Sequence, residues 1–466
     1  MLEPTKLYLL TATRVLALLR QNIITVEDYA RSLLDRIDER DSIVKAWTYI
    51  DPQLVLSQAR ALDKIPHTQR GPLHGVGVAI KDAINTKDMP TEFGSPLYRG
   101  NRPGFDSSTV SILRSAGALI FGKTTTSEFT WTNSGPNTTN PHDPNRTPGG
   151  SSAGSAAAVA DFQVPLSLGT QTGGSVIRPA SYTGIFAMKP TYNAISPEGQ
   201  KTCTITIDSF GFFARSIEDL QLVADVFALH DDGPLEDISL KEARVAFIKT
   251  PVWPRAGPGT IAAMEKAATI LESHGVKVEQ VSFPSEFSDI DALKRMHNVV
   301  ANSDAQGAFL REYRMDKTKL APEIRRLVEN GSNYTRKERV QAVDRYASMR
   351  PIFDKIAANY SAVITPSVID EAPLGLNDFG SAAFNWFWTG IHMPVINIPA
   401  FTGAHGMPIG ISVVAGRFFD QHLLKACRVL SEPLMAEGGW KIEKPDSSAR
   451  DTMTLAQSRF DGNSSL

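Results

Sequence analysis

The side chains best suited to chemistry in this chain are one lysine and two serines. Lys81 follows a run of apolar residues, and Ser151 and Ser175 each follow a pair of glycines. A serine hydroxyl attacks a carbonyl carbon efficiently only when a base accepts its proton, and an unprotonated lysine amine is such a base. A free lysine has a pKa of about 10.4, so burial of Lys81 would have to lower that pKa substantially. The chain therefore contains residue types that could serve as the nucleophile and the base of such a reaction.

The residues before Ser175 suit a second requirement of such chemistry. Thr172, Gly173 and Gly174 form a short run in which two positions lack a Cβ, so their backbone N–H groups can approach a ligand closely. Several N–H groups aimed at one oxygen stabilise the oxyanion of a tetrahedral intermediate. We therefore predict an oxyanion hole at Thr172, Gly173 and Gly174. A tight turn would explain the glycines but not the serine beside them.

A formal match to the phosphate-binding loop occurs at 117–124, Gly-Ala-Leu-Ile-Phe-Gly-Lys-Thr. Its four middle residues are apolar, which favours a buried strand over a turn that presents N–H groups to phosphate. Residues 109–116 favour a helix that ends at Gly117. We do not expect nucleotide binding here.

A second formal match, at 150–154, is the nucleophile elbow G-x-S-x-G with Ser152 at its tip. That elbow needs a strand directly before the serine. Residues 140–149 contain three prolines, which argue against a central strand. His392 and His405 lie downstream, but neither is marked as the histidine partner. Ser152 therefore stays an alternative nucleophile that only mutation separates from Ser175.

The elements that must position these residues favour an α/β fold. Residues 243–248 and 276–283 have strand character and flank a helix predicted at 259–273, which is a βαβ unit. Further strands are predicted at 76–80, 118–121, 362–364, 395–398 and 409–414, and a helix at 420–430. We expect a mixed β-sheet core surrounded by helices, in one domain over residues 1–445. Within it we expect an N-terminal helical wrap (1–66), a glycine-rich core (67–200) and a helical insertion (about 286–358), with residues 446–466 as a mobile tail.

Composition limits the partners. The 466 residues carry 48 Lys plus Arg and 50 Asp plus Glu, a formal net charge of −2, which argues against a nucleic-acid partner. Cys203 and Cys427 are too few for a disulfide framework and lack the spacing of a zinc site. The apolar stretch near the N-terminus is interrupted by Arg14 and Arg20, which favours neither a signal peptide nor a membrane span. We expect a cytoplasmic protein that acts on a small molecule, without a membrane partner and with a homodimer as one possible assembly.

Longer blocks around these residues resemble the amidase signature family of C–N hydrolases. They are Gly-Pro-Leu-His-Gly-Val at 71–76, Gly-Lys-Thr at 122–124, Pro-Gly-Gly-Ser-Ser at 148–152, Ser-Ala-Ala-Ala-Val-Ala at 155–160 and Gly-Thr-Gln-Thr-Gly-Gly-Ser at 169–175. The resemblance runs from about 71 to 192 and resumes at 390–416, with Met-Pro-Val at 393–395 and Gly-Met-Pro-Ile-Gly at 406–410.

This resemblance implies an amidohydrolase that cleaves a small amide through an acyl-enzyme, without a metal or cofactor. It implies that Ser175 is the nucleophile, Lys81 the base and Ser151 the proton relay, with a cis peptide bond between Gly150 and Ser151. The family also contains enzymes that cleave esters and carbamates, and glutaminase-like subunits of tRNA-dependent amidotransferases that work with partner proteins. These alternatives stay open.

Two positions depart from the commonest family pattern, and four are candidates for substrate binding. Gln171 stands where the family usually has Asp, and Gly77 where it usually has Pro. Arg178 could bind a substrate carboxylate or brace the loop beside it. The remaining candidates are aromatic residues that could line the acyl pocket or belong to the core: Phe129, Trp131 and Trp386, with Phe384 and Trp388 close to the last of these.

Overall fold

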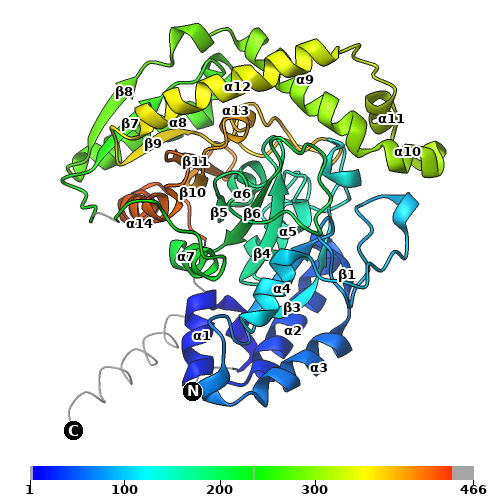
Figure 1. Cartoon of the computed structure of the whole chain (residues 1–466). Helices are drawn as coiled ribbons and strands as arrows, with labels where there is room; N and C mark the ends of the chain where they lie inside the picture. The colour runs from blue at the N-terminus through cyan, green and yellow to red at the C-terminus, as the bar shows by residue number, and fades with distance from the viewer. Residues whose placement is uncertain (1–3, 235–236, 443–466) are drawn as a thin grey trace.

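The computed structural model describes residues 4–234 and 237–442, and within them the chain builds a mixed sheet of eleven strands (Figure 1). The strand order across the sheet is β1-β3-β2-β4-β6-β5-β10-β11-β9-β7-β8. The strands are β1 (Trp47–Ile50), β2 (Gly77–Lys81), β3 (Leu119–Thr124), β4 (Leu166–Gln171), β5 (Phe186–Lys189), β6 (Ser209–Ala214), β7 (Arg244–Ile248), β8 (Lys277–Val281), β9 (Ala362–Pro366), β10 (Val395–Thr402) and β11 (Pro408–Val414).

Helices cover both faces of this sheet. They are α1 (Ala12–Arg20), α2 (Val26–Val44), α3 (Pro52–Asp63), α4 (Ser108–Ser115), α5 (Ala153–Ala160), α6 (Ile177–Thr183), α7 (Ile217–Val226), α8 (Pro258–Ser273), α9 (Ile290–Ala308), α10 (Leu310–Asp316), α11 (Pro322–Val328), α12 (Arg336–Ala357), α13 (Trp386–Gly390) and α14 (Asp420–Glu437). The predicted α/β class with a mixed sheet and surrounding helices is confirmed. None of the helices in the described part of the chain is both long and apolar enough to cross a membrane.

The sheet is mixed because it contains both parallel and antiparallel strand pairs. Strand β2 pairs in parallel with β3 and β4, and β7 pairs in parallel with β8 and β9. The predicted βαβ unit is confirmed, since β7, α8 and β8 follow one another and the two strands are parallel. Strands β4 and β6, β5 and β6, and β10 with both β5 and β11 are antiparallel.

Alternation of side chains along the strands divides the core into two layers. Val78 and Ile80 of β2 belong to one cluster of buried apolar residues, whereas Ala79 between them belongs to the cluster on the opposite face. In β3, Ile120 and Phe121 divide in the same way. Neighbouring residues of a strand point to opposite faces, so both faces of this sheet are packed.

The segment that matches the phosphate-binding loop is a buried strand, as the sequence analysis predicts. Helix α4 ends at Ser115, Gly117 follows with a positive φ of 87°, and β3 begins at Leu119. All six residues of β3 are buried. The N–H groups of this segment therefore belong to the sheet.

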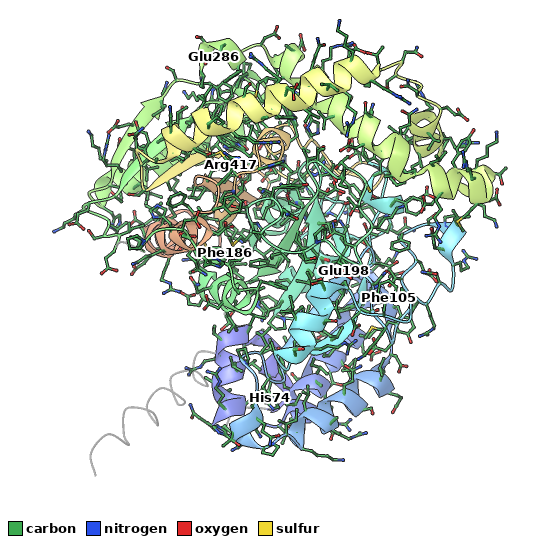
Figure 2. All side chains as sticks on the ribbon, in the orientation of Figure 1. His74, Phe105, Phe186, Glu198, Glu286 and Arg417 are labelled. Carbon is green, nitrogen blue, oxygen red and sulfur yellow. The ribbon has the colours of Figure 1, made fainter. Side chains whose placement is uncertain are left out.

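Two groups of helices lie at opposite ends of the molecule. Helices α1–α3 occupy the end where the chain starts, and α9–α12 lie across the other end, within the range predicted for a helical insertion (Figure 1). Figure 2 shows His74 near the first group and Glu286 near the second. Helix α14 is longer than predicted, because it continues through Pro433 to Glu437. The division of the chain into a single domain with a wrap and an insertion stays a prediction, and the predicted tail 446–466 lies outside the described residues.

Candidate active site

The sequence-predicted site residues come from adjacent ends of strands and helices. Lys81 is the last residue of β2, and β4, which pairs in parallel with β2, ends at Gln171. The loop that follows β4 carries Ser175 and leads into α6. Ser151 lies two residues before the start of α5, which packs on both β2 and β4. Carboxyl ends of neighbouring parallel strands meet at one edge of a sheet, and sites in open α/β sheets form at that edge.

The Lys81 amine lies within a cluster of hydroxyl groups. Its Nζ is 2.8 Å from Ser151 Oγ, 2.9 Å from Ser152 Oγ and 2.9 Å from Thr170 Oγ1. The carbonyl oxygen of Thr170 is 3.4 Å away. The peptide bond between Gly150 and Ser151 is cis, as predicted. A neutral amine has one lone pair and two N–H bonds, so this cluster can donate one hydroxyl proton to the amine and accept both of its hydrogens.

Burial sets the protonation state of Lys81. The residue has none of its surface exposed, and this desolvation lowers the pKa of its amine to about 7. The Cys203 thiol and the Asp208 carboxyl act in the opposite direction, and the Arg178 guanidinium lowers the pKa further. Desolvation dominates because the charged ammonium loses its water while the neighbouring hydroxyls carry no net charge.

Asp82 does not form an ion pair with Lys81, although it is the next residue in the chain. Its carboxylate lies 3.3 Å from Nζ of Lys123 on β3 and accepts a hydrogen bond from the Glu92 N–H at 3.2 Å. Asp82 therefore has a structural, hydrogen-bonding role. The ion pair with Lys123 keeps this negative charge away from the Lys81 amine.

The loop from Thr172 to Ser175 presents free N–H groups. Among the hydrogen bonds of the described residues, none uses the N–H of Gly173, Gly174 or Ser175. The Thr172 hydroxyl instead anchors the loop by donating to Asp208 Oδ1 at 2.5 Å. This arrangement suits an oxyanion hole, and the assignment of Thr172, Gly173 and Gly174 to that hole stays a prediction.

Ser175 lies in this loop with 8% of its surface exposed. Within the described part of the chain, hydrogen bonds link Lys81 to Ser151 but none links Ser151 to Ser175. Proton transfer from Ser175 to Ser151 therefore stays a prediction. Such hydrogen bonds frequently shorten only when substrate is bound.

Arg178 is buried and directed at backbone carbonyls. Its Nε and Nη2 donate to the carbonyl oxygen of Gly150 at 3.2 and 2.5 Å, and its Nη1 donates to the carbonyl of Gly380. These contacts match the bracing role, because they hold the peptide that precedes Ser151. Recognition of a substrate carboxylate by Arg178 stays an untested prediction.

The three aromatic candidates occupy different surroundings. Phe129 is fully buried and packs against Phe93 and Phe309, so in this structure it is part of a core cluster. Trp131 is half-buried, with its ring edge-on to Phe309. Trp386 lies 5.3 Å from the ring of His297. Their contact with substrate stays a prediction.

The surroundings of Ser152 differ from those of a nucleophile elbow. No strand precedes it in the structure, where residues 140–149 form turns and isolated bridges. His405 pairs with Glu371, and His392 stacks on Tyr192 and bonds to the carbonyl of Thr206. Neither histidine contacts Ser152, whose hydroxyl instead faces Lys81.

Sequence reasoning missed three polar residues of the site. Thr170 precedes Gln171 on β4, and its contact with Lys81 could have been inferred from the pairing of β2 with β4. Asp208 and Thr389 bond to the loop of Ser175 from 36 and 216 residues away, and no local pattern marks them.

Comparison with known proteins agrees with this geometry. The sequence model of the family described as Amidase matches residues 28–424. The chain belongs to the amidase family. It is 37% identical over 295 residues to the A subunit of glutamyl-tRNA(Gln) amidotransferase from Acidothermus cellulolyticus, an alignment that spans 59% of this chain and 58% of that protein. The corresponding protein of Symbiobacterium thermophilum, of the same name, is 30% identical over 470 residues, which is 90% of this chain and 95% of that one.

A solved structure described as an amidase superposes with a TM-score of 0.81 and 27% sequence identity, and the match covers 92% of this chain and all of the other. Membership of the amidase family makes the protein an enzyme that hydrolyses carbon–nitrogen bonds other than peptide bonds. Small-molecule amides are the general substrates of the family.

The depressed pKa of Lys81 predicts a pH-dependent stability difference between the wild type and a Lys81→Met variant. An unfolded lysine titrates near 10.5 and the folded one at about 7, so between these pH values the unfolded wild type binds a proton that the folded protein does not. The contribution of Lys81 therefore lowers the free energy of unfolding of the wild type as the pH falls from 10 to 7. The decrease is at most about 1.4 kcal/mol per pH unit.

Methionine binds no proton, so the stability of Lys81→Met relative to the wild type should increase as the pH falls from 10 to 7 and level off below 7. Urea unfolding of both proteins across this range measures the difference in the free energy of unfolding. The other buried lysines are present in both proteins, so their contributions cancel in this difference. A difference that does not change with pH would contradict the depressed pKa.

Proposed function

We propose that this enzyme hydrolyses the C–N bond of a small carboxamide through an acyl-enzyme on Ser175. The observation that carries the proposal is the Lys81 amine, which is fully buried and 2.8 Å from Ser151 Oγ. The nearby loop supports it, because the N–H groups of Gly173, Gly174 and Ser175 bond to none of the described residues. With a pKa of about 7, about half of the Lys81 amines are neutral at pH 7, against about one in 2,500 for a free lysine.

In the proposed reaction, Lys81 accepts the Ser151 hydroxyl proton while Ser151 accepts the proton of Ser175. The Ser175 oxygen forms a bond to the amide carbon, and the carbonyl oxygen becomes an oxyanion that accepts hydrogen bonds from the loop N–H groups. When the C–N bond breaks, the proton returns from Lys81 through Ser151 to the leaving nitrogen. A water molecule, deprotonated along the same path, then attacks the ester carbon and releases the acid and Ser175.

The catalytic groups alone do not determine which class of substrate the enzyme cleaves. Esters and carbamates react by the same steps, because they present the same carbonyl and a leaving group that is easier to expel. The near-complete burial of Lys81, Ser151 and Ser175 favours a small or narrow acyl group over a folded protein substrate.

A second candidate is the glutaminase-like subunit of a tRNA-dependent amidotransferase. The relatives that match 90% of this chain at 30% and 31% identity carry the name of the A subunit of glutamyl-tRNA(Gln) amidotransferase, and these relatives support the second candidate more directly than a stand-alone amidase. The two candidates share the chemistry of Ser175. They differ in whether the chain works alone or with partner subunits, in which case glutamine is the amide and ammonia is passed on.

Substitution of each proposed catalytic residue tests the assignment. Lys81→Ala, Ser151→Ala and Ser175→Ala should each lower amide turnover by at least about 10⁴-fold, because the three groups act as a unit. A panel of aliphatic, aromatic and carboxylate-bearing amides, with glutamine, esters and carbamates included, measures turnover. A fluorophosphonate should label Ser175 in the wild type but not in Ser175→Ala.

Ser196→Ala is the matched control, since Ser196 is exposed on the surface and should keep full activity. If Ser152→Ala were the only serine substitution that abolishes turnover and labelling, Ser152 would be the nucleophile and the assignment would be wrong.

Assembly separates the two candidates. A stand-alone amidase should hydrolyse at least one amide of the panel as a purified single chain, with a native mass that equals one or more copies of it. A chain that belongs to an amidotransferase should be inactive alone and release ammonia from glutamine once its partner subunits are added. Activity that requires a second protein would favour the second candidate, and full activity of the single chain would exclude it.

A further inference from the structure

Helix α13 holds the loop of Ser175 through one hydroxyl. Thr389 is fully buried, and its Oγ1 donates a hydrogen bond to the carbonyl oxygen of Gly173 at 2.9 Å. The carbonyl of Asn385, one helical turn earlier, lies 3.1 Å from the same Oγ1. A hydroxyl has one hydrogen, so these two carbonyls compete for it. Figure 1 shows α13 between the α9–α12 helices and the centre of the sheet.

The bond to Gly173 determines where an oxyanion donor points. The carbonyl of Gly173 and the N–H of Gly174 belong to one planar trans peptide, in which the two groups point in opposite directions. Holding the carbonyl against α13 therefore directs the Gly174 N–H away from the Thr389 hydroxyl. Glycine on both sides of this peptide would otherwise let it rotate at little cost.

Gln171 fixes the hydroxyl that holds this peptide. Its Nε2 donates to Thr389 Oγ1 at 3.0 Å, and its Oε1 accepts the N–H groups of Val176 and Ile177 at 2.8 and 3.0 Å. The Gln171 carboxamide thus links the end of β4 to the start of α6 and also donates a hydrogen bond to the Thr389 hydroxyl oxygen. An ionised aspartate, the residue usual at this position, could accept the two N–H groups but has no hydrogen to donate to Thr389.

The start of α13 also packs closely against the loop. A Cβ added to Gly174 would clash with Oδ1 of Asn385, the residue directly before α13, so the N-terminal end of this helix lies against the loop. The only polar link that the described residues make from α13 to the Gly173–Gly174 peptide is the Thr389 hydroxyl.

We propose that Thr389 and Gln171 are positioning residues for the oxyanion hole, which together hold the Gly173–Gly174 peptide with the Gly174 N–H directed at the oxyanion. The proposal rests on the proposed function of Ser175 as nucleophile. Together the two residues couple α13 to the loop of Ser175.

Thr389→Val and Thr389→Ser form a matched pair that tests the hydroxyl. Valine keeps the shape but removes the hydroxyl, whereas serine keeps the hydroxyl. Loss of an oxyanion donor lowers rates by about 10²–10³-fold, and a misdirected donor should lower them less, so we expect Thr389→Val to react at least about tenfold more slowly. Thr389→Ser should stay within about threefold of the wild type.

The readouts are the second-order rate of Ser175 labelling by a fluorophosphonate, and kcat and KM for the best amide of the panel. A weaker oxyanion hole lowers the labelling rate and kcat but leaves KM nearly unchanged, because it acts on the transition state. A double-mutant cycle with Gln171→Met tests the coupling. Loss of the Thr389 hydroxyl should matter less when Gln171 no longer orients it.

Three outcomes would overturn the proposal. They are a Thr389→Val protein labelled as fast as the wild type, a Thr389→Ser protein as slow as Thr389→Val, and additive effects of the two sites. Thermal unfolding verifies that each variant is folded, and Thr389→Ala replaces valine in the comparison if the valine variant is not. A wild type that is not labelled on Ser175 would instead contradict the proposed function.

Discussion

The structure depends on the removal of water from one amine. Lys81 ends a strand that is buried on both faces, and the groups around its Nζ are hydroxyls and a backbone carbonyl. These groups satisfy hydrogen bonds without supplying a counter-charge, so burial is not offset as it would be beside a carboxylate. The nearest acidic residue in sequence, Asp82, is occupied by Lys123 on the next strand. By excluding water from Lys81 and leaving it without a carboxylate in contact, the fold lowers the pKa of this amine to about 7, and the amine is the proposed base.

The same edge of the sheet also positions Ser151 and the loop of Ser175 near the Lys81 amine. Strands β2 and β4 end side by side, and hydrogen bonds to Asp208 and Thr389 anchor the loop between β4 and α6. In the described part of the chain, the N–H groups of Gly173, Gly174 and Ser175 in this loop have no hydrogen-bond partner. Arg178 holds the peptide before Ser151, and Asp208 holds Thr172. The catalytic loop is rich in glycine, which permits close approach but supplies no rigidity. Rigidity comes from polar side chains of segments that are distant in the sequence.

Local sequence predicted the elements and the chemistry, but not these supports. The apolar run before Lys81 and the glycine pairs before the serines affect residues that are adjacent in the sequence. Their structural effect can therefore be predicted from a short stretch of chain. Thr389 acts from 216 residues away, and a threonine followed by Gly390 has no pattern that marks it as a loop anchor. Phe129 illustrates a different limit, because the same apolar ring can line a pocket or fill a core, and here it is fully buried. Arg178 is similar, since carboxylate recognition and loop bracing use the same guanidinium.

The most direct test of the account is a titration of the Lys81 side chain itself. Lysine labelled with ¹³C at Cε reports its protonation through the chemical shift in NMR spectra, and the signal missing from Lys81→Met assigns the resonance. The account predicts a midpoint near pH 7 for this signal, while exposed lysines titrate above about 10. A Lys81 signal that titrates together with the exposed lysines would show an amine that stays charged at neutral pH, and this result would contradict its role as the base.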